Sequence, residues 1–125
     1  MEKQVLITVN SVMDDSSGES DKMSFVTEGI LYKENDDYVI SYKESEITGL
    51  DGTTTTLRVS RNSVTLTRHG NVDTTMFFEK GKTHLSDYNT KYGSVMLGIT
   101  AKNVDVNLSE SGGDIKVDYI LEYNR

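Results

Sequence analysis

Two residues of opposite charge, Glu44 and Arg68, are the side chains in this sequence whose type and spacing best suit chemistry. Glu44 follows Tyr42 by two positions and Arg68 follows Leu66 by two positions, each in a segment of alternating apolar residues. Residues two apart in a β-strand share a face, so both charges are expected to point toward the apolar interior. Because a buried charge needs a partner, we predict an ion pair between Glu44 and Arg68 inside one end of the fold.

This pair has two interpretations that the sequence leaves open. In the first it is purely structural: the planar guanidinium holds the carboxylate with two hydrogen bonds, and removing one partner costs about 3 to 5 kcal/mol. In the second it lines a polar cavity for a small amphipathic or anionic molecule, together with tyrosines, which outnumber phenylalanines by seven to three and combine an apolar ring with a polar group. The candidate ligand-binding residues are Tyr42, Glu44, Arg68, Tyr88 and Tyr92. An open cavity beside the pair distinguishes the two interpretations.

Strands must position these residues, because alternation with a period of two recurs along nearly the whole chain and a helical period almost nowhere. We predict about ten short strands, over residues 3–13, 22–33, 37–46, 53–60, 63–69, 73–79, 83–90, 94–101, 104–108 and 114–123. Short turns between them, including one at Lys102 and Asn103, indicate antiparallel neighbours, and Gly29 and Gly98 inside strands indicate bulges or corners. The prediction is an all-β fold with little helix, an antiparallel up-and-down barrel of about 8 to 10 strands, with a two-sheet sandwich as the alternative.

The predicted core is the more apolar face of each strand. It consists of Val5, Ile7, Val9, Met23, Phe25, Leu31, Leu57, Val59, Val64, Leu66, Val95, Leu97, Ile99, Ile115, Val117, Tyr119 and Leu121. On the same parity Thr27, Tyr42, Glu44, Thr55 and Arg68 join this core, while Tyr88, Thr90 and Tyr92 share one face of a more ambiguous strand.

The tract 14–21 is acidic, rich in serine and free of apolar residues, which predicts a mobile surface loop. Asp14, Ser16 and Gly18 are spaced like the first ligands of a calcium loop. The pattern fails, however, because Glu19 occupies the required glycine position and Phe25 the closing acidic position.

Composition narrows the function further. At 125 residues the chain is expected to form one domain over residues 1–125. The absence of cysteine excludes disulfides, thiolate metal sites and a cysteine nucleophile. His69 and His84 are fifteen residues apart and have no acidic residue at ligand spacing on the same strand face, so we predict no metal site and no cofactor.

A formal net charge of -7 repels phosphate backbones and anionic lipids, so neither nucleic acid nor a membrane is an expected partner. The first ten residues alternate without an apolar run, from which we expect no signal peptide and a cytoplasmic location.

Several segments together resemble the YwiB-like bacterial domain of unknown function across nearly the whole chain. They are FVTEGILY (25–32), ISYKESEITGL (40–50), VTLTRHG (64–70), MFF (76–78), YNTKYG (88–93) and the stretch 113–121. The resemblance implies a calycin-like, lipocalin-type β-barrel in a small cytosolic bacterial protein. Its most specific pieces contain Glu44 and Arg68, but no catalytic residues are established for the family and none is transferred.

Three hypotheses for function follow. The preferred one is a non-enzymatic barrel that binds a small ligand in its lumen. The second is an interaction or structural module with a filled core, acting as a homodimer or through an outer strand face that includes Thr54, Thr56 and Arg58. The third is an enzyme in which Glu44 serves as a general base, which would require an open carboxylate with a raised pKa.

Overall fold

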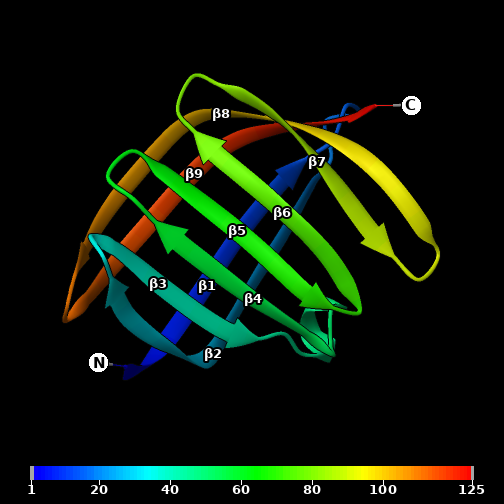
Figure 1. Cartoon of the computed structure of the whole chain (residues 1–125). Helices are drawn as coiled ribbons and strands as arrows, with labels where there is room; N and C mark the ends of the chain where they lie inside the picture. Colours follow the sequence, from blue (N-terminus) through cyan, green and yellow to red (C-terminus); the bar gives the residue numbers. More distant parts are fainter. Residues whose placement is uncertain (1, 125) are drawn as a thin grey trace.

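The computed structural model describes residues 2–124 and forms one antiparallel sheet in which each strand pairs with the next along the chain. The strands are β1 (Lys3–Asp14), β2 (Ser20–Glu34), β3 (Asp37–Lys43), β4 (Thr53–Val59), β5 (Ser63–Gly70), β6 (Val72–Glu79), β7 (Thr83–Thr90), β8 (Gly93–Ser109) and β9 (Gly112–Asn124). The sheet curls so that the β1–β2 hairpin passes behind β3 to β6 (Figure 1). This nearly closed, up-and-down barrel confirms the predicted fold class.

Short turns produce this order. The two-residue turn between β2 and β3 places Asn35 at a φ of 57°, in the left-handed region that asparagine tolerates. The one helical segment among residues 2–124 is a single 3-10 turn, η1 (Glu46–Thr48), between β3 and β4. With such links each strand can only fold back on its neighbour.

The predicted strands 94–101 and 104–108 are one strand, β8, so the sheet has nine strands instead of ten. The turn predicted at Lys102 and Asn103 is wrong, because β9 pairs on both sides of it, with Ala101 opposite Tyr119 and Asn103 opposite Asp118. The register shift there is a bulge, which bends the strand without interrupting its pairing.

The acidic tract 14–21 contains the exposed hairpin turn between β1 and β2, over residues 15–19. This agrees with the predicted surface loop, and its mobility stays a prediction. Asp14 pairs with Ser20, and the Asp15 carboxylate accepts hydrogen bonds from the backbone N–H groups of Ser17 (2.9 Å) and Glu19 (3.1 Å). The Asp15 side chain here provides hydrogen-bond acceptors for the backbone N–H groups of a tight turn.

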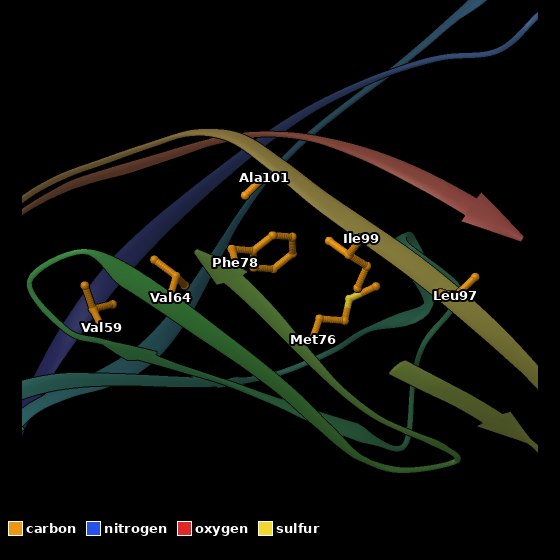
Figure 2. Close-up of a cluster of buried hydrophobic side chains, with 7 residues drawn as sticks. All are labelled: Val59, Val64, Met76, Phe78, Leu97, Ile99 and Ala101. Atoms are coloured by element: carbon orange, nitrogen blue, oxygen red, sulfur yellow. The ribbon is translucent and has the colours of Figure 1, made fainter. Parts of the chain in front are cut away.

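The core lies between β4, β5 and β6 on one side and β8 on the other. Its fully buried cluster consists of Val59, Val64, Met76, Phe78, Leu97, Ile99 and Ala101. Figure 2 shows Met76 and Phe78 of β6 extending toward Ile99 of β8. The buried residues Leu31, Val59, Val64, Leu97 and Ile99 confirm that part of the predicted core.

Three predicted core residues, Met23, Val95 and Tyr119, are instead more than a third exposed. Met23 lies toward the free end of the β1–β2 hairpin and Val95 beside the β7–β8 turn, near the ends of their strand pairs. Met76 and Phe78 were missed, because the run Met76 to Phe78 is apolar throughout and does not indicate which face is inward.

Gly29 allows close packing of the first three strands. A Cβ added there would lie 2.5 Å from Ile7 Cδ1 and 2.5 Å from the backbone oxygen of Ser41, whereas a Cβ at Gly98 would meet nothing nearer than 3.8 Å. Gly29→Ala should therefore lower the free energy of unfolding by about 1 to 3 kcal/mol. Gly98→Ala is the matched control and should change it by no more than about 1 kcal/mol. Urea denaturation measures both, and equal stability of the two variants would contradict this packing.

Candidate functional site: a buried carboxylate and an arginine on the inner wall

Glu44 points inward although β3 ends one residue before it. The backbone N–H of Glu44 donates to the carbonyl oxygen of Thr53 at 2.8 Å, which extends the β3–β4 pairing by one residue. The chain then turns at Ser45, whose side chain accepts from the N–H of Ile47 and caps η1. The predicted strand 37–46 is therefore too long, and Glu46 lies exposed in the turn.

Two threonine hydroxyls hold the Glu44 carboxylate. Its side chain is 2% exposed. Oε1 accepts from Thr48 Oγ1 at 3.0 Å and Oε2 from Thr55 Oγ1 at 2.5 Å. Thr48 belongs to η1 and Thr55, which is fully buried, to β4. Oε2 thus has the Thr55 hydroxyl as donor, whereas Oε1 shares the single Thr48 hydroxyl proton with the Ser45 carbonyl oxygen, which also lies 3.0 Å from Thr48 Oγ1.

Arg68 approaches the same carboxylate from β5. It lies opposite Thr55 of β4 and Thr74 of β6 in the register, and its Nε is 4.0 Å from Glu44 Oε2. The ion pair predicted from strand parity is confirmed. The predicted two-hydrogen-bond geometry is wrong, because 4.0 Å is too long for a hydrogen bond, and the buried Nε has no hydrogen-bond partner.

Tyr42 lies two residues before Glu44 and is buried, with its ring centroid 6.3 Å from that of Phe25. Burial raises the pKa of its hydroxyl to about 12, the negative charge of Glu44 contributes in the same direction, and the positive charge of Arg68 opposes it. Tyr42, Glu44 and Arg68 therefore form one group on the inner wall.

The other two candidate tyrosines lie elsewhere. Tyr88 of β7 is half-buried, pairs with Thr74 of β6 and packs against the core cluster. Tyr92 lies in the β7–β8 turn, 88% exposed, with Lys91 Nζ 5.2 Å from its ring centroid. The expectation that Tyr92 shares an inward face with Tyr88 is wrong, because the turn carries its side chain outside.

The barrel wall opens next to Arg68. The β6–β7 ladder runs only from Val72 opposite Thr90 to Thr74 opposite Tyr88, and the rest of β7 pairs with β8 alone. A groove of about 470 Å³ lies at this opening, lined by Thr67, Arg68, His69, Asp73, Thr74, Thr75, Leu85, Ser86, Asp87 and Asn89. Glu44 is not part of this lining. A second hollow of about 860 Å³ lies over β1 to β4 and includes Tyr42.

Ser86 is a groove residue that sequence reasoning missed. It is 5% exposed, and its Oγ and Arg68 Nε are the two buried side-chain polar atoms without a hydrogen-bond partner in the described part of the chain. The sequence does contain an indication of its inward position. Ser86 lies two residues before Tyr88, so the two side chains share one face of β7. The apolar neighbour Leu85, 61% exposed, obscured that face.

Two other features of residues 2–124 bear on the kind of site. No group of three or more histidine, aspartate or glutamate side chains is arranged to hold a metal ion. Within the same range, no helix has the length and apolar character needed to cross a membrane.

Comparison with known proteins finds a matching family, a similar sequence and a similar structure. The family described as "Domain of unknown function (DUF1934)" matches residues 7–125. The chain is 29% identical over 119 residues to the "Uncharacterized beta-barrel protein YwiB" of Bacillus subtilis (strain 168), covering 94% of this chain and 81% of that protein. The crystal structure of the ywiB protein from Bacillus subtilis superposes with a TM-score of 0.90 at 26% identity, covering 97% of this chain and 83% of that one.

The raised pKa of Tyr42 predicts a loss of stability in alkali. Between the ordinary value of 10.0 and the folded value of about 12, the unfolded chain releases the tyrosine proton while the folded chain keeps it. The stabilisation of the folded state by Tyr42 is therefore fully present below pH 10 and decreases as the pH rises toward 12. Urea denaturation at about pH 9 and about pH 11.5 should show a smaller alkaline loss in Tyr42→Phe than in the unmodified protein.

Tyr92→Phe, in the exposed turn, is the control and should keep the full alkaline loss. An identical pH dependence in Tyr42→Phe and the unmodified protein would contradict the burial of the Tyr42 hydroxyl.

Proposed function

This chain belongs to the DUF1934 family of domains of unknown function, and we propose that it binds a small amphipathic or anionic molecule at the inner wall beside Arg68, without acting as an enzyme. Of the predicted ligand-binding residues, Arg68 lines the groove and is the proposed direct contact. Glu44 would balance its charge from 4.0 Å away, whereas Tyr42 lines the second hollow and Tyr88 packs against the core. We propose the cytoplasm as its location. The observation that carries the proposal is the buried Arg68 Nε, which has no hydrogen-bond partner although a carboxylate lies 4.0 Å away.

An unpartnered buried donor favours a ligand with an acceptor group. Leaving such a group unsatisfied costs about 1 to 3 kcal/mol, and an arginine carries five N–H donors and no acceptor. Glu44 balances the charge of Arg68, but both of its oxygens already accept from threonines. An external carboxylate, carbonyl or hydroxyl oxygen can therefore take the free donors without displacing Glu44.

The groove beside Arg68 suits a small molecule. Its volume is about 470 Å³, and it is open to solvent along the barrel wall. Leu85 is the one apolar side chain among the residues that line the groove, and it is exposed there. This combination supports binding of a molecule with a polar head and a small apolar part.

The hypothesis of Glu44 as a general base has less support. A general base must come within hydrogen-bond distance of the substrate group that it deprotonates. The Glu44 side chain is almost fully buried and is held by Thr48 and Thr55. Binding without catalysis fits this carboxylate better.

The homodimer stays a prediction. Of the outer-face residues suggested for it, Arg58 is already paired with Glu34 and Asp37 at 3.0 Å each. The hydroxyl of Thr56 lies 3.2 Å from that of Ser41. These groups are satisfied within the chain, so the outer face of β4 offers little to a partner.

Native mass spectrometry of the protein, purified gently from the organism that makes it, tests the proposal. The unmodified protein should carry mass beyond the polypeptide, and Arg68→Gln should lose it, because the ligand then lacks its charged donor. Arg61→Gln removes the same charge from an exposed turn and should keep the extra mass. Bare polypeptide in all three proteins would contradict the proposal.

A further inference from the structure

The groove between β6 and β7 contains four ionisable side chains, Arg68, His69, Asp73 and Asp87. His69 Nδ1 and Asp73 Oδ1 are 2.9 Å apart, so these two groups satisfy each other on the outer rim. Within residues 2–124, the Asp87 carboxylate has no cationic nitrogen within ion-pair distance. The groove therefore offers an external molecule one cation with a free donor and one free carboxylate.

From this pairing we infer that the groove binds a small zwitterion, a molecule such as a free α-amino acid that carries both a carboxylate and an ammonium group. Its carboxylate lies against Arg68 and Ser86, and its ammonium group against Asp87. The inference rests on the proposed function and names the ligand class for the same site.

Strand geometry explains how one molecule reaches both charges. Ser86 and Asp87 are consecutive on β7, so their side chains point to opposite faces of the wall. In an intact wall a ligand would contact only one of them. The wall is open here, because the β6–β7 ladder stops at Thr74, whose hydroxyl donates to the backbone oxygen of Asp87 at 2.8 Å. This bond fixes the position where the strands part.

Two unsatisfied donors define the carboxylate end. Ser86 is almost fully buried and Arg68 is partly buried, and their partnerless atoms, Oγ and Nε, belong to side chains that line the same groove. A hydroxyl and a guanidinium can together donate to the oxygens of one carboxylate.

The groove suits the two simpler ligand classes less well. A monoanion would approach a rim that bears Asp73 and Asp87 on a protein of net charge -7, and a monocation would leave the buried donors of Arg68 and Ser86 without an acceptor. A zwitterion has no net charge, and each of its ends has an opposite charge to meet. Leu85, exposed at the rim, provides apolar surface for a short side chain.

Three probes of nearly equal shape test the inference: leucine, 4-methylpentanoate, which lacks the ammonium group, and 3-methylbutylamine, which lacks the carboxylate. Chemical-shift titration of the ¹⁵N-labelled protein should give leucine an affinity about tenfold or more above either analogue. Asp87→Asn should reduce leucine binding to the level of 4-methylpentanoate, and Arg68→Gln and Ser86→Ala should weaken both acids.

Asp114→Asn, which removes an exposed carboxylate at the start of β9, is the control and should bind all three probes as the unmodified protein does. The dispersion of the amide spectrum verifies that each variant is folded.

Failure of the inference is distinguishable from failure of the proposed function. Equal binding of leucine and 4-methylpentanoate, both weakened by Arg68→Gln, would overturn the zwitterion and leave the anion site intact. Preference for leucine that survives Asp87→Asn would also overturn it. Affinities unaffected by Arg68→Gln, or no binding of any probe at millimolar concentration, would overturn the inference, and bare polypeptide in native mass spectrometry would overturn the proposed function as well.

Discussion

The buried carboxylate of Glu44 is the constraint around which one end of the barrel is built. A charge removed from water must be compensated locally, and three consecutive parts of the chain do this for Glu44. The end of β3 aims the side chain inward, η1 supplies the hydroxyl of Thr48, and β4 supplies that of Thr55. Arg68 then contributes its charge from β5 without a direct hydrogen bond. The result is an ion pair of zero net charge in which the Nε–H group of Arg68 still lacks a hydrogen-bond acceptor.

The opening in the wall has its cause in the core. The inner side chains of β6, Met76 and Phe78, pack against Ile99 and its neighbours on β8, and β7 pairs with β8 instead of following β6 beyond Thr74. The strands consequently part beside Arg68. The same packing that stabilises the barrel thus produces the groove, and it leaves Ser86 buried at the edge of the groove without a partner.

Much of this arrangement could be predicted from the sequence, because it depends on local rules. Alternation and turn residues identified an up-and-down all-β fold, and parity along two strands placed Glu44 and Arg68 on the same inner wall. Rules of this kind fail at positions whose structure depends on packing between segments that are distant in the sequence. The continuous β8, with its bulge at Ala101 and Asn103, depends on β9, and the exposure of Tyr92 depends on where a turn leaves the wall. The roles of Ser86 and Asp87 arise only because β6 and β7 separate, which no local pattern encodes.

The coupling between Glu44 and Arg68 is the most direct test of this account. Urea denaturation of Glu44→Gln, Arg68→Gln and the double variant gives the interaction energy as the departure from additivity. If the two charges lie together inside the barrel, each single substitution is destabilising and the coupling is about 0.5 to 3 kcal/mol. Additive effects, with a coupling of zero, would contradict the shared buried site.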